Sequence, residues 1–177
     1  MKITSENFSS PLTFRKFQHF YLTKRKIIKG GKLVNKDFEY CLVELEINSA
    51  KANYVIAKEL IGQTTERLGV SSYITKGICT GKDLEGLVAK HPYLERGSII
   101  LTGDHVTTEA GTGIVHTAPG HGLEDYSVAR ENGLEVLSPV KSNGTFKDEV
   151  EHVSGMFVFK SNETIIGETL TYTTIKA

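Results

Sequence analysis

The sequence predicts one α+β domain that is rich in β-structure, in the form of a distorted β-barrel with a few short helices. Three observations lead to this prediction. Short runs of strand-forming residues recur along the chain, and glycines or polar turn residues separate them. Helical patterns are few, and strands do not alternate with helices as they do around a parallel sheet. The 177 residues, of which 39% are hydrophobic, suffice for one domain with a buried core.

The strands are predicted from short runs of β-branched and aromatic residues that end at turns. The first two runs form a hairpin across residues 48–51, and the second run continues into a short helix. Residues 82–90 alternate between polar and apolar positions, which predicts a loop or a short strand before a turn at His91-Pro92. The predicted strands cover residues 40–47, 54–61, 70–79, 98–102, 105–108, 111–115, 136–140, 144–146 and 156–159.

One longer helix is predicted over residues 124–132. Val128 and Ala129 face inward in this prediction, and Gly133 ends the helix in the left-handed conformation that glycine favours.

Composition excludes several classes of protein. The formal net charge is zero, so the chain as a whole does not attract nucleic acid, and any RNA contact must come from local patches or from shape. No apolar run reaches the ~18 to 20 residues of a membrane span, and the start lacks the apolar segment of a signal peptide. Cys41 and Cys79 lie far apart without metal or redox spacing, which predicts two free core thiols. We expect a soluble cytoplasmic protein without membrane contact.

Residues 1–36 differ from the rest because they are strongly basic. Aromatic residues interleave with the cations, which is compatible with an RNA-contacting arm, an amphipathic targeting segment or an idle tail. The fold of this segment is left open, disorder included. Its basic residues are Lys2, Arg15, Lys16, Lys24, Arg25, Lys26, Lys29, Lys32 and Lys36.

The stretch Gly111–Tyr126 concentrates chemically active residues. It holds two histidines, two carboxylates, four glycines and a proline within sixteen residues. Ala118-Pro119-Gly120 predicts a turn of defined shape, since proline fixes φ and glycine permits a close backbone approach. The side chains that such a turn could present are those of His116, His121, Glu124 and Asp125.

Several chemistries compete for this stretch. A metal site of His116, His121 and Asp125 has suitable ligand types but lacks the helical spacing of zinc hydrolases. A nucleophilic triad would need an activated serine or cysteine, and a phosphate loop would need a lysine after its glycines. A small-molecule pocket is also open, in which Asp125 holds an ammonium group and His116 shapes the wall. A buried histidine with a hydrogen-bonded carboxylate is the purely structural alternative.

The run Gly111–Tyr126 resembles the signature of the editing domain that is inserted in isoleucyl-tRNA synthetases of class I. Further motifs resemble the same family in the same order, so the resemblance covers about residues 37–163. The related valyl and leucyl domains normally lack a histidine followed by Thr-Ala-Pro-Gly-His. The further motifs are Gly81-x-x-Leu-x-Gly86, His91-Pro-Tyr-x-x-Arg96, Gly103-Asp-His-Val-Thr107 and Gly133-Leu-Glu-Val-Leu-Ser-Pro139.

The resemblance implies hydrolysis of valine that is wrongly esterified to isoleucine tRNA, without a cofactor. It implies that Asp125 binds the α-amino group of the misattached amino acid and that His116 limits side-chain size and positions the ester. Both are the expected catalytic residues, and Gly113 and Thr117 join them as substrate-binding residues. The expected partner is the acceptor end of tRNA(Ile) carrying valine, with a separate synthetase core as a further possible partner.

The sequence departs from the family at both ends. The family opens this domain with a threonine-rich strand next to tryptophan, but this chain has no tryptophan and no such run before Tyr40. After residue 163 the resemblance fades, although Thr171–Thr174 offers hydroxyl groups that could replace the missing ones. Synthetase signatures of the HIGH and KMSKS kind are absent from the sequence.

We therefore expect a fragment of a larger synthetase, with a basic segment at 1–36, an editing domain at 37–163 and a non-matching tail at 164–177. It would act as an aminoacyl-tRNA deacylase in proofreading, and ATP-dependent ligation is not expected. The alternative is a non-catalytic tRNA-binding or degenerate remnant of a synthetase.

Overall fold

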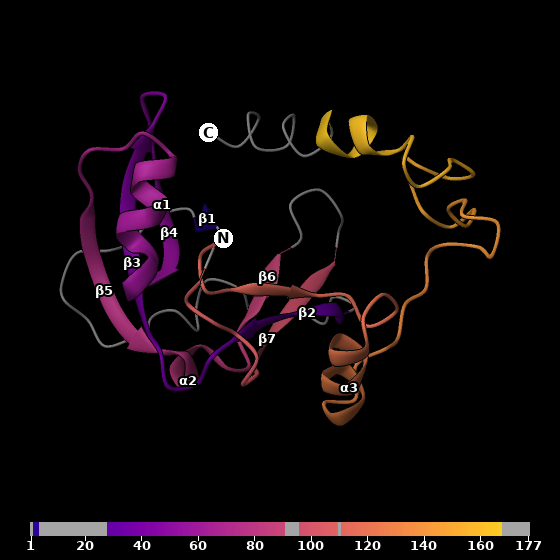
Figure 1. Cartoon of the computed structure of the whole chain (residues 1–177), viewed down its shortest axis with the longest axis horizontal. Helices are drawn as coiled ribbons and strands as arrows, with labels where there is room; N and C mark the ends of the chain where they lie inside the picture. The colour runs from indigo at the N-terminus through magenta and orange to yellow at the C-terminus, as the bar shows by residue number, and fades with distance from the viewer. Residues whose placement is uncertain (1, 4–27, 91–95, 110, 168–177) are drawn as a thin grey trace. The chain divides into compact units, whose positions relative to one another are not determined.

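The structure is a computed structural model that describes residues 2–3, 28–90, 96–109 and 111–167 (Figure 1). The predicted turn at His91-Pro92 and the run Thr171–Thr174 lie outside the described residues. Contacts divide the chain into two compact units. Residues 31–89 and 99–117 form most of the first unit, and the second unit consists mainly of the chain from residue 118 onward.

The first unit is built around an antiparallel sheet with the strand order β1-β4-β3-β5. Strands β3 and β4 form the predicted hairpin, because Asn48 and Ser49 both adopt positive φ and close a two-residue turn. The bounds of the four strands are Lys2–Ile3 for β1, Glu39–Ile47 for β3, Ala50–Ala57 for β4 and Ile74–Thr80 for β5.

The helix predicted after the second strand is present. A 3-10 turn, η2 (Lys58–Leu60), leads from β4 into α1 (Ile61–Arg67). Leu60 and Ile61 anchor this segment on the core of the sheet, and α1 lies beside β3 and β4 in Figure 1. Both cysteines are free and buried, as predicted: Cys41 lies in β3 and Cys79 in β5.

A second sheet has the strand order β6-β7-β2-β8. It includes residues 28–34, which fall within the basic N-terminal segment defined from the sequence. The bounds are Ile28–Val34 for β2, Val88–Lys90 for β6, Gly97–Thr102 for β7 and Val115–Thr117 for β8. Strand β7 confirms the strand predicted at residues 98–102.

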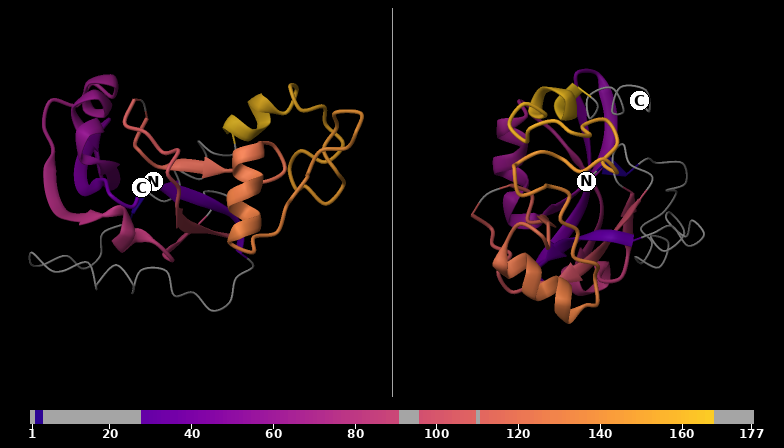
Figure 2. Two further views of the ribbon diagram at one scale, coloured as in Figure 1. Left: turned by 60° about the horizontal axis from the view of Figure 1, so that its bottom comes forward. Right: turned by 90° about the vertical axis from the view of Figure 1, so that its right-hand side faces the viewer.

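The second unit contains the predicted helix, α3 (Leu123–Glu131). Ala129 is fully buried, Val128 is half-buried, and Gly133 has φ 65°, so the predicted inward face and helix end are confirmed. Figure 2 shows the chain beyond α3 as loops that lead to a short helix at residues 162–167.

Four predictions about the fold were wrong. The described residues form two four-stranded sheets and no closed barrel. Residues 105–108 form no strand, because the Gly103 carbonyl accepts a hydrogen bond from the Val106 amide and closes a turn at residues 104–105. Residues 111–114 form no strand either: a turn lies at residues 111–112, and β8 begins only at Val115. The strands predicted at residues 136–140, 144–146 and 156–159 shrink to two isolated bridges, Val140↔Phe146 and Thr145↔Phe157.

The segment predicted as a loop or short strand at residues 82–90 contains a helical turn, α2 (Gly81–Leu84), before β6. A capping box creates this turn: the Asp83 carboxylate accepts hydrogen bonds from the amide and the hydroxyl of Thr80. These bonds also hold the pKa of Asp83 below its usual value. Within the described residues, every helix is too short or too polar to cross a membrane.

Candidate functional site

The first half of the stretch Gly111–Tyr126 is fixed by contacts with distant elements of the first unit. The Thr112 carbonyl accepts a hydrogen bond from the Ala57 amide at 2.9 Å, and the Gly111 carbonyl accepts one from the Thr64 hydroxyl at 3.1 Å. Gly113 has φ 71°, and a Cβ at this position would lie 2.5 Å from the Cβ of Ala57. Only glycine fits there without displacing the core.

The side chain of Tyr40 also holds the loop Gly111–Gly113 in place. Its fully buried hydroxyl donates to the Gly113 carbonyl at 2.7 Å and accepts from the Asn35 amide at 3.0 Å. Burial raises the pKa of Tyr40, so the hydroxyl keeps its proton and remains a donor at neutral pH. The Tyr40 hydroxyl thus joins the β2–β3 connection to the glycine loop.

Strand β8 carries the next two candidate residues on opposite faces. His116 is exposed and stands opposite Lys32 of β2, with the Lys32 Nζ 3.4 Å from His116 Nδ1. Thr117 stands opposite Gly31 and is completely buried. Its hydroxyl has no hydrogen-bond partner among the residues that the structure describes. A buried hydroxyl without a partner costs about 1–3 kcal/mol, which makes Thr117 an unusual residue in this sheet.

The second half of the stretch forms the predicted turn in the second unit. The Ala118 carbonyl accepts a hydrogen bond from the His121 amide at 2.9 Å, with Pro119 and Gly120 at the corner. A Cβ on Gly120 would lie 2.1 Å from the Leu137 carbonyl oxygen, so the passing backbone requires glycine here. Sequence reasoning correctly identified this turn, but not the segment that packs on it.

Asp125 is held in place by the turn that precedes its helix. It lies in the first turn of α3 and is half-buried, and its Oδ2 accepts the Ala118 amide at 2.9 Å. This bond satisfies one carboxylate oxygen, whereas Oδ1 has no hydrogen-bond partner among the described residues. The carboxylate is therefore oriented and keeps one oxygen for a further donor.

The sequence-predicted site residues divide between the two units. Gly113, His116 and Thr117 belong to the first unit, and Asp125 belongs to the second. His121 and Glu124 are exposed, and neither side chain makes a hydrogen bond to another described residue. Gly113 is buried under tight contacts, and its expected role in substrate binding stays a prediction, as does that of Thr117.

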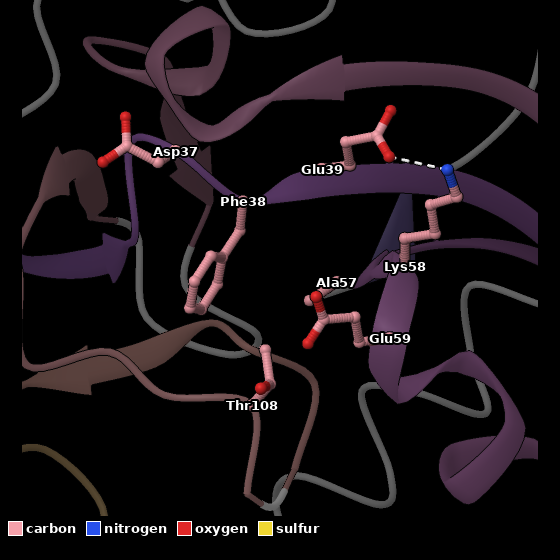
Figure 3. A pocket seen from close by; sticks show the side chains of 7 residues that line it. All are labelled: Asp37, Phe38, Glu39, Ala57, Lys58, Glu59 and Thr108. Carbon is pink, nitrogen blue, oxygen red and sulfur yellow. Dashed lines mark hydrogen bonds and ion pairs between the residues drawn. The ribbon is translucent and has the colours of Figure 1, made fainter.

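A hollow of about 350 Å³ opens elsewhere in the first unit (Figure 3). Three carboxylates surround it, and an ion pair of 2.6 Å between Lys58 and Glu39 crosses one side. None of the predicted site residues lines it. The lining residues are Asp37, Phe38, Glu39, Ala57, Lys58, Glu59 and Thr108.

Metal ligands do not gather in the part of the chain that the structure describes. No group of three or more His, Cys, Asp or Glu residues there could hold a metal ion.

Comparison with known proteins gives the relationship. The chain is 45% identical to the isoleucine–tRNA ligase of Idiomarina loihiensis over 130 residues, which cover 72% of the chain. It is 44% identical to that of Halorhodospira halophila over 133 residues, or 75% of the chain. The chain is homologous to isoleucine–tRNA ligases. It matches only 14% of the length of either relative, and no protein-family model matches it.

Solved structures show the fold of this ligase segment. The editing domain of the cytosolic leucyl-tRNA synthetase of P. falciparum has a TM-score of 0.59 at 11% identity, covering 81% of this chain and 72% of that chain. The corresponding domain of P. knowlesi has a TM-score of 0.58 at 14% identity, covering 82% and 76%. The resemblance to the isoleucyl family is thus confirmed by sequence, and the editing-domain fold is confirmed by structure.

Proposed function

We propose that the chain is an aminoacyl-tRNA deacylase that hydrolyses valine from wrongly charged tRNA(Ile). Water attacks the ester carbonyl, the bond to the terminal ribose oxygen breaks, and the products are valine and free tRNA. The homology to isoleucine–tRNA ligases supports this proposal. The chemical need is general: one methylene contributes only about 1–3 kcal/mol to discrimination in an apolar pocket, so a second, hydrolytic step must remove valine.

The observation that carries the proposal is the geometry of Asp125. The Ala118 amide orients the carboxylate by binding Oδ2, and this arrangement supports a role for Oδ1 as the acceptor for a substrate ammonium group. Every aminoacyl ester carries such an ammonium beside its reactive carbonyl. A carboxylate fixed in this way would select a charged α-amino group over a blocked one.

His116 supplies the second part of the proposal, the size sieve. Its side chain is exposed on the edge strand β8, where it can meet a ligand. We assign to it the role of limiting the amino-acid side chain and positioning the ester. Removing the imidazole should admit isoleucine, so that His116→Ala hydrolyses correctly charged Ile-tRNA(Ile) as well.

A second candidate function is binding without hydrolysis. The observation that favours it is the absence from the sequence of tryptophan and of a threonine-rich run before Tyr40. In the resembled family these hydroxyl groups position the attacking water. Without them the domain would hold the aminoacyl end of tRNA and leave the ester intact.

Deacylation assays separate the two functions. Purified protein is incubated with Val-tRNA(Ile) and Ile-tRNA(Ile), and release of the labelled amino acid is followed over time. The proposal predicts release of valine above the buffer rate with isoleucine retained. Release at the buffer rate from both substrates by folded protein would refute the deacylase, and retention of Val-tRNA(Ile) on a filter would then identify the binding function.

A further inference from the structure

The solvent-facing side of α3 carries three exposed side chains that the proposed reaction does not use. Leu123 is 82% exposed and Tyr126 is 41% exposed, and Arg130 is exposed as well. Residues three and four apart are neighbours on the surface of a helix, so these side chains form one strip along α3. We call the set Leu123, Tyr126 and Arg130 the α3 strip.

The guanidinium of Arg130 is available for an anion. It makes no ion pair and no side-chain hydrogen bond with another residue that the structure describes. Three and four residues before it on α3 stand Ser127 and Tyr126, and neither is a carboxylate. The exposed carboxylates of the helix, Glu124 and Glu131, project about 100° away round the helix axis. The α3 strip therefore combines apolar and aromatic surface with an uncompensated positive charge.

Unpaired nucleotides match both features of this surface. Single-stranded RNA is bound by aromatic side chains that stack on its bases and by cations that meet its phosphates. An apolar protein segment would cover Leu123 and Tyr126 but would desolvate the Arg130 guanidinium without supplying an anion, which is costly. The composition of the α3 strip favours single-stranded RNA over such a protein partner.

The α3 strip starts beside the carboxylate that is proposed to bind the substrate. Asp125 and Tyr126 are successive residues, about 100° apart round the axis, and Arg130 lies about 6 Å beyond Tyr126 along the helix. All of them belong to the second unit. An amino acid held at Asp125 is esterified to the terminal ribose of the tRNA, so the adjoining unpaired nucleotides must lie against a nearby surface.

We propose that the α3 strip binds the unpaired acceptor end of tRNA, with Tyr126 stacking on a base and Arg130 binding a phosphate. In naming tRNA as the ligand this rests on the proposed function, but the binding itself requires no hydrolysis. The strip would thus hold the RNA while Asp125 holds the amino acid.

Binding of uncharged tRNA(Ile) to the full chain tests the stacking role of Tyr126. Fluorescence anisotropy measures the affinity for 5′-labelled tRNA(Ile) and for the same tRNA without its unpaired 3′ nucleotides. Tyr126→Ala should weaken binding of the complete tRNA about 10-fold and leave binding of the shortened tRNA unchanged. Tyr126→Phe keeps the ring and should bind like the parent. Tyr73→Ala is the matched control, because Tyr73 is 47% exposed in the first unit.

The dependence of binding on salt tests Arg130. Loss of one phosphate contact should reduce the slope of log K against log salt by about 0.7 in Arg130→Gln, whereas Arg130→Lys keeps the charge and the slope. Arg67→Gln is the control, since Arg67 is an exposed arginine in the last turn of α1. Parental urea midpoints in all these variants would show that the fold is unchanged.

Three results with Tyr126→Ala would overturn the inference: parental affinity, a loss equalled by Tyr73→Ala, or an equal loss with the shortened tRNA. Failure of the parent to bind either tRNA at low salt would also overturn it and would favour a protein partner for the α3 strip. If the variants lose tRNA binding as expected but the parent releases no valine, the proposed function fails and the inference stands. If valine is released while all variants bind tRNA alike, the inference fails and the proposed function stands.

Discussion

The two halves of Gly111–Tyr126 are held in opposite ways. The first half, up to Thr117, is fixed from outside, by hydrogen bonds from α1, from the end of β4 and from the Tyr40 hydroxyl. The second half, from Ala118, is fixed largely from within, through the turn at Ala118 and the bond from its amide to Asp125. The first half therefore depends on the core, whereas the second carries its own support.

This difference separates architecture from chemistry within one motif. Two glycines of the motif differ in how tightly they are packed. A Cβ on Gly113 would clash with the core, whereas a Cβ on Gly111 would meet nothing within 4 Å. Changes in the loop Gly111–Gly113 should lower stability, and changes at Asp125 should lower activity with the fold intact. Each prediction below tests one side of this division.

The largest effect is expected from Gly113→Ala. The new methyl group would lie 2.5 Å from the Ala57 Cβ and would occupy a backbone with φ 71°. Overpacking and positive φ together should lower the free energy of unfolding by about 2–5 kcal/mol. Gly111→Ala is the matched control, with φ 78° and open space, and should lose only about 1–2 kcal/mol. Urea unfolding measures both, and equal losses would contradict the packing of this loop.

Tyr40→Phe should have the next largest effect. It removes the hydroxyl that links Asn35 and Gly113, and it leaves the Gly113 carbonyl without that donor in a buried place. The expected loss is about 1–3 kcal/mol in the free energy of unfolding. Tyr54→Phe serves as the control, since no hydrogen bond of its hydroxyl to another described residue is found and its loss should stay below about 0.5 kcal/mol. A Tyr40→Phe protein as stable as the parent would show that the Tyr40 hydroxyl does not stabilise the loop at Gly113.

Thiol labelling measures how often the core around Cys41 and Cys79 opens to solvent. Burial raises the pKa of Cys79 to about 12, so at pH 8 only about one thiol in ten thousand is the reactive thiolate. We expect native protein to resist Ellman's reagent at both cysteines, and Gly113→Ala to react faster because it opens more often. Since the folded state holds the Cys79 proton more tightly, the free energy of unfolding should fall as pH rises from about 9 toward 12. Rapid labelling of native protein at pH 8 would contradict the closed core.

Much of the fold followed from local patterns. The β3–β4 hairpin was predictable because its strand formers flank a short polar turn, and α3 was predictable from its inward residues and Gly133. The helical turn α2 was missed, although Thr80 and Asp83 have the spacing of a capping box. The strands expected after residue 136 failed because a strand needs a partner, and Asn143 bonds locally to the Thr145 amide and hydroxyl instead.

The site could be predicted only in part. The motif identified His116 and Asp125 as candidates, and the turn at Pro119 was correct. The contacts that hold these residues were out of reach, because Lys32 and Tyr40 meet them through pairings between distant parts of the chain. Alternation of residue types gives the faces of a strand but does not reveal which strand lies beside it.

The central claim is that Asp125 performs chemistry while its surroundings provide the structure, and Asp125→Asn tests it most directly. The asparagine side-chain oxygen can still accept the Ala118 amide, so stability should change by less than about 1 kcal/mol, as checked by urea unfolding. The lost charge should cost about 1.5–3 kcal/mol in binding the substrate ammonium. We predict that kcat/KM for Val-tRNA(Ile) falls about 10- to 100-fold in this variant. An unchanged kcat/KM in a fully folded Asp125→Asn protein would contradict the account.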